Sequence, residues 1–287
     1  MHTIQSNETG VLRHLGGPPH QISNEDLRFY IAPRRTGSTL FIHLASGCDN
    51  AAATSRVISR SKNDNKSAFT PDYSIFKERF HPIFHKASKM MATKLIVKEE
   101  FGDDRRRGTN QVNECDFQVL PTAATIKSTR PAFGFRDPVS TFQSWKKKGW
   151  NDSSSLIKAF LSCYRQYKHA EYLIPETPVN VHDFFVSSET NSKAIMRTII
   201  RHWGLPYDDT MIDRPRPFAS KFVFMNKAEE DIYLRDAAGL FENMNSGAIR
   251  RDIPTHNLAS RKEIDSIIKI SMRFLAKSEL TALKSVA

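Results

Sequence analysis

The sequence predicts an α/β protein with three layers, in which helices flank a mostly parallel central sheet. Short apolar segments alternate with segments of helical periodicity along the 287 residues. Residues 29–41 read as a strand, a Gly-containing turn and the start of an apolar helix, and residues 132–145 show a second strand-to-helix transition. Such alternation is typical of a parallel sheet covered on both faces.

The length and composition favour one folded domain. We expect residues 1–25, which are polar and contain Gly16-Gly17-Pro18-Pro19, to form a flexible N-terminal arm. Residues 26–287 are then a single domain, and a hydrophobic content of 39% is enough for a core. There is no internal repeat.

Charge and cysteine content narrow the class of protein. The net charge of +11 suits an anionic ligand, a nucleic acid or an acidic membrane surface, although dispersed surface lysines explain it equally well. No apolar run approaches the roughly 20 residues of a spanning helix, and the N-terminus lacks the apolar core of a secretory signal. Cys48, Cys115 and Cys163 follow no metal-binding pattern. These features predict a cytoplasmic protein with reduced thiols.

The individual elements follow from apolar runs and from their start and stop signals. Each predicted strand is an apolar run before a polar or turn-forming residue, and the strands span residues 27–32, 94–98, 132–135 and 178–184. The predicted helices span residues 37–46, 138–148, 156–173, 191–203, 228–243 and 261–280. The helix at 191–203 has a clear stop at Gly204 and Pro206. Residues 47–75 form an insertion of unpredicted structure.

The turn after the first strand has the composition of an anion-binding loop. Its sequence from residue 33 is Pro-Arg-Arg-Thr-Gly-Ser-Thr. Gly37 lets the backbone approach an anion, and the amides and dipole of the following helix favour negative charge. The loop is not a nucleoside triphosphate loop, because no Gly begins it and no Lys follows Gly37. Its cation, Arg35, stands two positions before that glycine.

The second transition carries another arginine at a strand end. Arg136 closes an apolar run, Pro138 suits the first turn of a helix, and Ser144 follows eight residues after Arg136. An Asp-capped helix start explains Arg-Asp-Pro by itself. Two such motifs in this order, about 100 residues apart, favour a shared role.

Together these segments resemble the sulfotransferase family. Its 5′-phosphosulfate loop has the form P-x-[KR]-[ST]-G-[ST]-[ST], and its 3′-phosphate site pairs a strand-end Arg with a Ser eight positions later. The segment Trp203-Gly204-Leu205-Pro206 is similar to a late F-L-G-L-P of the family. The resemblance covers residues 27–206. It implies a P-loop NTPase-like sulfotransferase fold and transfer of a sulfuryl group from 3′-phosphoadenosine 5′-phosphosulfate (PAPS) to an acceptor hydroxyl or amine.

The resemblance also implies roles for single residues. Arg35 would bind the bridging oxygen of the donor, Lys98 falls on a family lysine, and Glu100 falls on the general base. The donor nucleotide would be held by Arg34, Arg35, Thr36, Gly37, Ser38, Thr39, Leu40, Arg136 and Ser144. Arg250 and Arg251 are the nearest candidates for the family's C-terminal Arg-Lys-Gly clamp.

Two departures leave adenine recognition unassigned. The Trp that often follows the loop in the family is replaced by Leu40-Phe41, and the usual Tyr-Glu-Asp appears as Val181-His182-Asp183.

The assignment of the base depends on strand geometry. Neighbouring residues on a strand point to opposite faces, so Glu99 and Glu100 should not both reach an acceptor. Burial beside Phe101 would raise the pKa of Glu100, whereas adjacent cations would oppose that. His43 is a second candidate base, and a solvated strand end is the simpler explanation of the two glutamates.

Other ligands and functions remain open alternatives. His81 and His85 have the spacing of metal ligands but no accompanying ligands, and we expect no metal. A P-loop nucleotide kinase would need a Walker-type Lys, which is absent. A non-catalytic anion- or nucleic-acid-binding protein fits the charge, but the aromatic–basic interleaving of single-strand binders is missing. We therefore expect a small-molecule acceptor and no nucleic acid, and a homodimer is left open.

The acceptor itself is not predicted. Residues 47–90 and 210–250 are expected to form its pocket, and the first range is rich in aromatic residues. A lipid, phenolic or natural-product acceptor is favoured on that account, although a packed helix face would give the same residues. The aromatic residues are Phe69, Tyr73, Phe76, Phe80 and Phe84.

Overall fold

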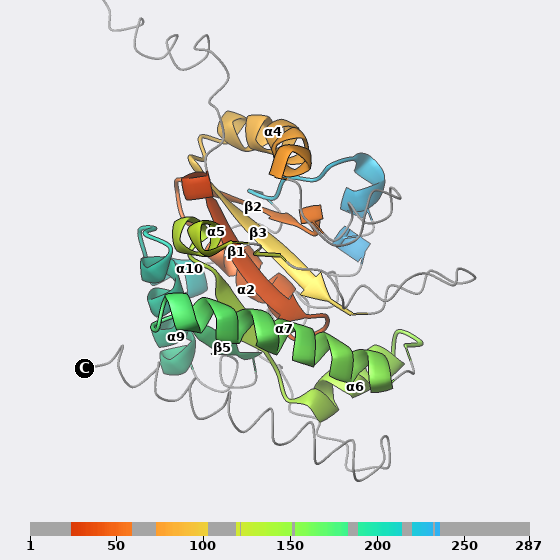
Figure 1. Cartoon of the computed structure of the whole chain (residues 1–287). Coiled ribbons are helices and arrows are strands. Elements are labelled where there is room, and N and C mark those ends of the chain that lie inside the picture. The colour runs from red at the N-terminus through yellow and green to blue at the C-terminus, as the bar shows by residue number, and fades with distance from the viewer. Residues whose placement is uncertain are drawn as a thin grey trace, which may run out of the picture.

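The computed structural model describes residues 24–58, 73–102, 119–120, 122–150, 153–182, 189–213, 220–231 and 233–235. Its centre is a parallel sheet of five strands in the order β2-β3-β1-β4-β5 (Figure 1). The strands are β1 (Leu27–Pro33), β2 (Ala51–Ser55), β3 (Lys94–Phe101), β4 (Ala132–Phe135) and β5 (Val179–Val181). The predicted α/β fold with a parallel sheet is confirmed.

Helices connect the strands and cover both faces of the sheet. They are η1 (Asn24–Asp26), α2 (Ser38–Ala45), α4 (Tyr73–Lys89), α5 (Ala123–Thr129), α6 (Pro138–Lys146), α7 (Ser153–Leu173), α9 (Glu189–His202) and α10 (Thr210–Asp213). Residues 227–231 and 233–235 are also helical. None of the helices in these ranges is long and apolar enough to cross a membrane.

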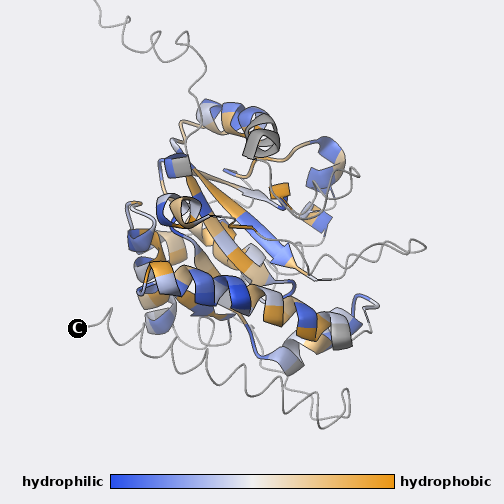
Figure 2. Ribbon diagram, in the orientation of Figure 1, coloured by the Kyte–Doolittle hydropathy of each residue, from blue (hydrophilic) through white to orange (hydrophobic). Residues whose placement is uncertain are grey.

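The two faces of the sheet follow from the alternation of side chains along β1. Phe29 and Ile31 belong to a core cluster with residues of α4, α5 and α7. Tyr30 and Ala32 belong to a second cluster with residues of α2 and α9. The sheet therefore separates two apolar layers. The hydrophilic residues of α7 lie on the side of the helix that is turned away from the sheet (Figure 2).

The strand β2 lies inside the insertion that the sequence left unassigned. Among its residues Ala-Ala-Ala-Thr-Ser only Thr54 is β-branched and none is aromatic, yet all are buried. The reason is tertiary, because a later segment pairs with β2 on its outer side. Ala53 N donates to Lys221 O over 2.9 Å, and Val223 N donates to Ala53 O over 2.8 Å. The short helix α5 was likewise not predicted.

A glycine lets β4 approach the side chain of the neighbouring strand β1. Tyr30 is fully buried, and its hydroxyl accepts a hydrogen bond from Asn180 Nδ2 over 2.9 Å. A Cβ at Gly134 would lie 2.2 Å from the Tyr30 hydroxyl oxygen, so no other residue fits there. The Tyr30 ring stacks on Phe41 at a centroid distance of 4.3 Å. This stack fixes α2 against the sheet.

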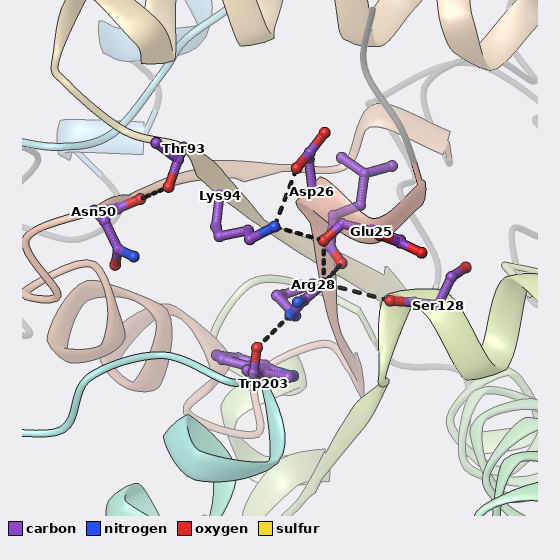
Figure 3. A network of polar contacts seen from close by, with 9 residues as sticks. Glu25, Asp26, Arg28, Asn50, Thr93, Lys94, Ser128 and Trp203 are labelled. Atoms are coloured by element: carbon purple, nitrogen blue, oxygen red, sulfur yellow. Dashed lines mark hydrogen bonds and ion pairs between the residues drawn. The ribbon is translucent and has the colours of Figure 1, made fainter.

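The amino ends of the strands are tied together by buried Arg28 (Figure 3). Its Nε donates to Trp203 O over 2.5 Å, and Nη1 donates to Glu25 O over 2.8 Å. Lys94 adds an ion pair to Asp26 of 3.1 Å. These contacts join η1, β1, β3 and the end of α9 at the edge of the sheet opposite the carboxyl ends of the strands.

Candidate active site

The loop after β1 has the backbone of an anion-binding turn. Arg35 and Gly37 adopt positive φ angles of 66° and 82°. Gly37 is the N-cap residue of α2 and contributes no side-chain hydrogen bond, and the first turn holds no acidic residue. The amides of this turn therefore face no capping side chain, which is the arrangement that accepts an anion. Thr36 Oγ1 donates to Pro33 O over 2.7 Å and closes the loop.

Polar side chains of β3 lie against the start of α2. Lys98 Nζ donates to Glu100 Oε1 over 2.9 Å and to Thr39 Oγ1 over 3.0 Å. Ser38 Oγ donates to the same carboxylate oxygen over 2.5 Å. Figure 2 shows β3 changing from hydrophobic at its start to hydrophilic toward its carboxyl end. The predicted residues Ser38, Thr39, Lys98 and Glu100 thus form one network.

The charges of this network are set by opposing effects. Burial by itself would raise the pKa of Glu100, but the charges of Lys98 and Arg34 and the hydrogen bonds from Ser38 and Lys98 outweigh it. The pKa of Glu100 falls to about 2. Burial lowers the pKa of Lys98, and Glu100 partly opposes that effect. Glu100 is therefore an ionised carboxylate of low basicity in this arrangement.

Glu99 points away from this network. It is fully buried on the opposite face of β3, where its Oε1 accepts a hydrogen bond from Ile58 N over 2.7 Å. The two glutamates thus lie on opposite faces, as strand geometry predicts. The alternative base His43 is buried in α2. Leu40 is also buried, and its side chain packs in the core cluster of α2 and α9.

The motif around Arg136 lies beside the anion-binding loop and contacts it through Ser144. Asp137 caps α6, because its Oδ2 accepts a hydrogen bond from Ser140 N over 2.7 Å. Two turns later, Ser144 Oγ accepts a hydrogen bond from Arg35 Nε over 3.0 Å. Arg136 is partly buried at the end of β4. Two motifs about 100 residues apart in the sequence therefore form one site.

Arg34 connects the loop to its surroundings. Its backbone N donates to Phe101 O over 2.8 Å, and its backbone O accepts from Trp145 Nε1 over 3.0 Å. Its guanidinium carbon lies 5.8 Å from the centre of the Trp150 ring. The side chain is buried, in contrast to that of Arg35. Arg34 thus joins β3 and α6 and adds positive charge beside Glu100.

Two residues of the site were not assigned a role from the sequence. The ring of His182, directly after β5, lies against Gly37. The ring centre of Tyr233 lies 5.7 Å from Lys98 Nζ. The position of His182 directly after a predicted strand indicates that its side chain could lie at the carboxyl edge of the sheet, where the site is. Tyr233 had no such signal, since its place depends on the pairing of residues 221–223 with β2.

The expected acceptor region is only partly described. Phe80 and Phe84 are buried in the core, so they do not support an aromatic acceptor pocket. A hollow of about 400 Å³ lies between the end of α4 and residues 222–230. Phe222 and Phe224 line it and also pack on Tyr233. The hollow and the Lys98 network therefore share one aromatic cluster.

Several predictions fall on residues outside the described ranges. They concern most of the N-terminal arm, the insertion around residues 59–72, the candidates Arg250 and Arg251, and the helix at 261–280. His81 and His85 are exposed on α4.

Known proteins resemble this chain in the path of the backbone and not in sequence. No protein-family model and no curated protein matches the sequence. A sulfotransferase domain from the curacin biosynthetic pathway is 9% identical over 86% of this chain and 96% of its own, with a TM-score of 0.42. A sulfotransferase domain from the Synechococcus PCC 7002 olefin synthase is 10% identical over 87% of this chain and 94% of its own, with a TM-score of 0.41. At these values the function has to be argued from the site.

Proposed function

We propose that this protein is a sulfotransferase, which transfers a sulfuryl group from PAPS to a hydroxyl or amine of a small-molecule, lipid or natural-product acceptor. The observation that carries the proposal is the contact of Arg35 Nε with Ser144 Oγ at 3.0 Å. It joins the anion-binding loop to the helix that starts beside Arg136. A donor with phosphate groups at both its 5′ and 3′ positions would occupy both parts of such a site.

The charges around the loop support an anionic donor. Arg35 belongs to the loop, Lys98 contacts Thr39 at the start of α2, and the charge of Arg136 acts on His182 beside Gly37. Glu100 is paired with Lys98 at 2.9 Å. Sulfuryl transfer depends mainly on alignment and on stabilisation of the charge that develops on the leaving group. In the proposed reaction, Arg35 stabilises the bridging oxygen as the sulfur–oxygen bond breaks, and Lys98 assists it.

The low pKa of Glu100 restricts its proposed role as the base. With a pKa of about 2, Glu100 is a poor acceptor for the proton of an acceptor hydroxyl. A bound donor would attract the ammonium group of Lys98 and the hydroxyl of Ser38, both of which now stabilise the carboxylate. Losing those partners and gaining a nearby anion both raise a carboxyl pKa. We therefore assign the base role to Glu100 only when the donor is bound.

Ligand-dependent thermal stability and a transfer assay test the proposal. Adenosine 3′,5′-bisphosphate should raise the melting temperature, whereas ATP with magnesium and oligonucleotides should not. Labelled PAPS should then label at least one member of an acceptor panel of alcohols, phenols, amines and lipids. Stabilisation by ATP with magnesium would favour a kinase, and stabilisation by oligonucleotides would favour a nucleic-acid-binding protein.

Arg35→Ala provides the mechanistic control. Because the proposed role of Arg35 is at the breaking bond, this variant should lose more turnover than affinity for adenosine 3′,5′-bisphosphate. A variant that loses product affinity but keeps its turnover at saturation would contradict the role.

A further inference from the structure

His182 lies at the end of a fourth strand, β5, and its ring lies against the anion-binding loop. It follows β5 directly, and β5 pairs with β4 beside the end of Arg136's strand. A Cβ built at Gly37 would lie 2.0 Å from Nδ1 of the His182 ring, which is the heavy atom nearest to it. The imidazole therefore occupies the space that any side chain at position 37 would need. Position 37 requires glycine because of this contact and because of its φ of 82°.

The ring nitrogen that faces Gly37 is buried and unsatisfied. His182 is 7% exposed, and Nδ1 has no hydrogen-bond partner among the residues that the structure describes. Buried polar atoms are nearly always hydrogen-bonded, and those that are not often serve a ligand or a reaction. A phosphate oxygen in the loop would supply the missing acceptor.

The electrostatics suit a neutral donor. Burial and the charge of Arg136 lower the pKa of His182 to about 3, so the imidazole is uncharged at pH 7. A neutral imidazole still carries one N–H, and it can carry it on Nδ1. It can donate to an anion without repelling Arg136. A lysine or a protonated histidine at this position would not have that property.

We propose that His182 is a binding residue for the phosphate group held in the loop at Gly37, to which its Nδ1–H donates a hydrogen bond. The ligand class is a nucleoside 5′-phosphate or its sulfated anhydride, and the identity of the nucleotide rests on the proposed function. His182 thereby complements Arg136 and Ser144, which the resemblance assigns to the 3′-phosphate.

Three variants of His182 distinguish the effect of its ring nitrogen from the effect of its packing against Gly37. His182→Leu has a similar volume and lacks the nitrogen, His182→Ala lacks it without any new contact at Gly37, and His182→Asn places an amide near the position of Nδ1. The affinity of each full-length variant for adenosine 5′-phosphate and for adenosine 3′,5′-bisphosphate is measured by calorimetry, with thermal melts to confirm folding.

The Leu and Ala variants should bind both nucleotides about 10- to 100-fold more weakly, as expected for one lost hydrogen bond to a charged group. The Asn variant should stay within about threefold of the natural protein. The ligand-free Leu variant should melt no lower than the natural protein, because it removes an unsatisfied buried nitrogen.

Either nitrogen-free variant with unchanged affinity would overturn the proposal, as would an Asn variant as weak as the Ala variant. A loss confined to the bisphosphate would also overturn it, since that pattern belongs to the 3′-phosphate. If the natural protein binds both nucleotides but transfers no sulfuryl group, the proposed function fails while the assignment of His182 is still decided. If the natural protein binds neither nucleotide, both proposals fail.

Discussion

Glu100 is the residue whose environment most directly limits its chemistry. Its carboxylate accepts hydrogen bonds from Ser38 and Lys98, whereas Glu99 is held on the other face by Ile58 N. Glu99 and Glu100 are therefore matched controls for each other, because the same substitution can be made on either face of β3.

Glu100→Gln keeps the size of the side chain but removes its basicity. It should reduce turnover by roughly 10²- to 10⁴-fold, which is the range for loss of a general base. Glu99→Gln should be much milder. The measurement is turnover with one accepted substrate, and thermal melting confirms that both variants fold. An unchanged rate for Glu100→Gln would remove the base role from Glu100 and leave His43 as the remaining candidate, because Glu99 lies on the opposite face of β3.

Arg136 offers a second test at this scale, because adenosine 5′-phosphate lacks the group that Arg136 is expected to bind. Arg136→Ala should weaken binding of adenosine 3′,5′-bisphosphate by about 1.5–3 kcal/mol, the range for a hydrogen bond to a charged group. Binding of adenosine 5′-phosphate should change little. Calorimetry with both nucleotides makes the comparison, and equal weakening of both would assign Arg136 a structural role.

At the scale of elements, α5 and α6 both start with a side-chain cap, and they differ in their distance from the site. Asp137 caps α6, which carries Ser144 to the loop. Thr122 caps α5 by accepting a hydrogen bond from Thr125 N over 3.1 Å, and α5 contributes to the core behind the sheet. Removing each cap in turn therefore tests whether nucleotide binding depends on the position of α6, with α5 as the control.

Asp137→Ala and Thr122→Ala should each destabilise the protein by about 1 kcal/mol, as is usual for a lost N-cap. Only Asp137→Ala should also weaken adenosine 3′,5′-bisphosphate binding, since it loosens the helix that positions Ser144. Asp137→Asn keeps a cap without the charge and should restore both properties. Chemical denaturation and calorimetry give the two values. Weaker binding in the Thr122 variant would show that the effect is general.

The elements also show how far the sequence predicts this structure. The strands β1, β3, β4 and β5 are apolar runs, and their turns carry local signals, so most of the loop and the motif around Arg136 could be placed. The strand β2 could not be placed, because the segment that pairs with it, Lys221 to Val223, follows 169 residues later in the chain at the contact between Thr54 and Val223. His182 and Tyr233 enter the site through packing, which no local pattern encodes.

For the whole molecule, buried ionisable groups predict loss of stability in acid. Burial lowers the pKa of His202 from 6.5 to about 4, so the unfolded chain takes up a proton first and stability is lost as the pH falls from about 6.5 to about 4. The pKa of Glu100 falls from 4.5 to about 2, so its contribution is complete above pH 4.5 and is lost toward pH 2.

Denaturation at pH values from 2 to 7 should show both ranges. Replacing Glu100 with Gln should cost on the order of 3 kcal/mol near pH 7, and the difference from the natural protein should shrink as the pH falls below about 4.5. His202→Gln should make the decline between about pH 6.5 and 4 shallower without abolishing it, because the lowered pKa of His182 acts over the same range. A difference between the natural protein and Glu100→Gln that stays constant down to pH 2 would show that the carboxylate charge does not stabilise the fold.

The strand order has a consequence for the order in which the chain folds. The central strand β1 is made first among the described strands, yet its two partners are β3 and β4, which end at Phe101 and Phe135. Contacts between such distant segments form slowly and leave apolar surface exposed during synthesis. The anion-binding loop emerges early from the ribosome but has no support until these strands follow. Affinity for a nucleotide should therefore appear late, once His182 has joined the sheet.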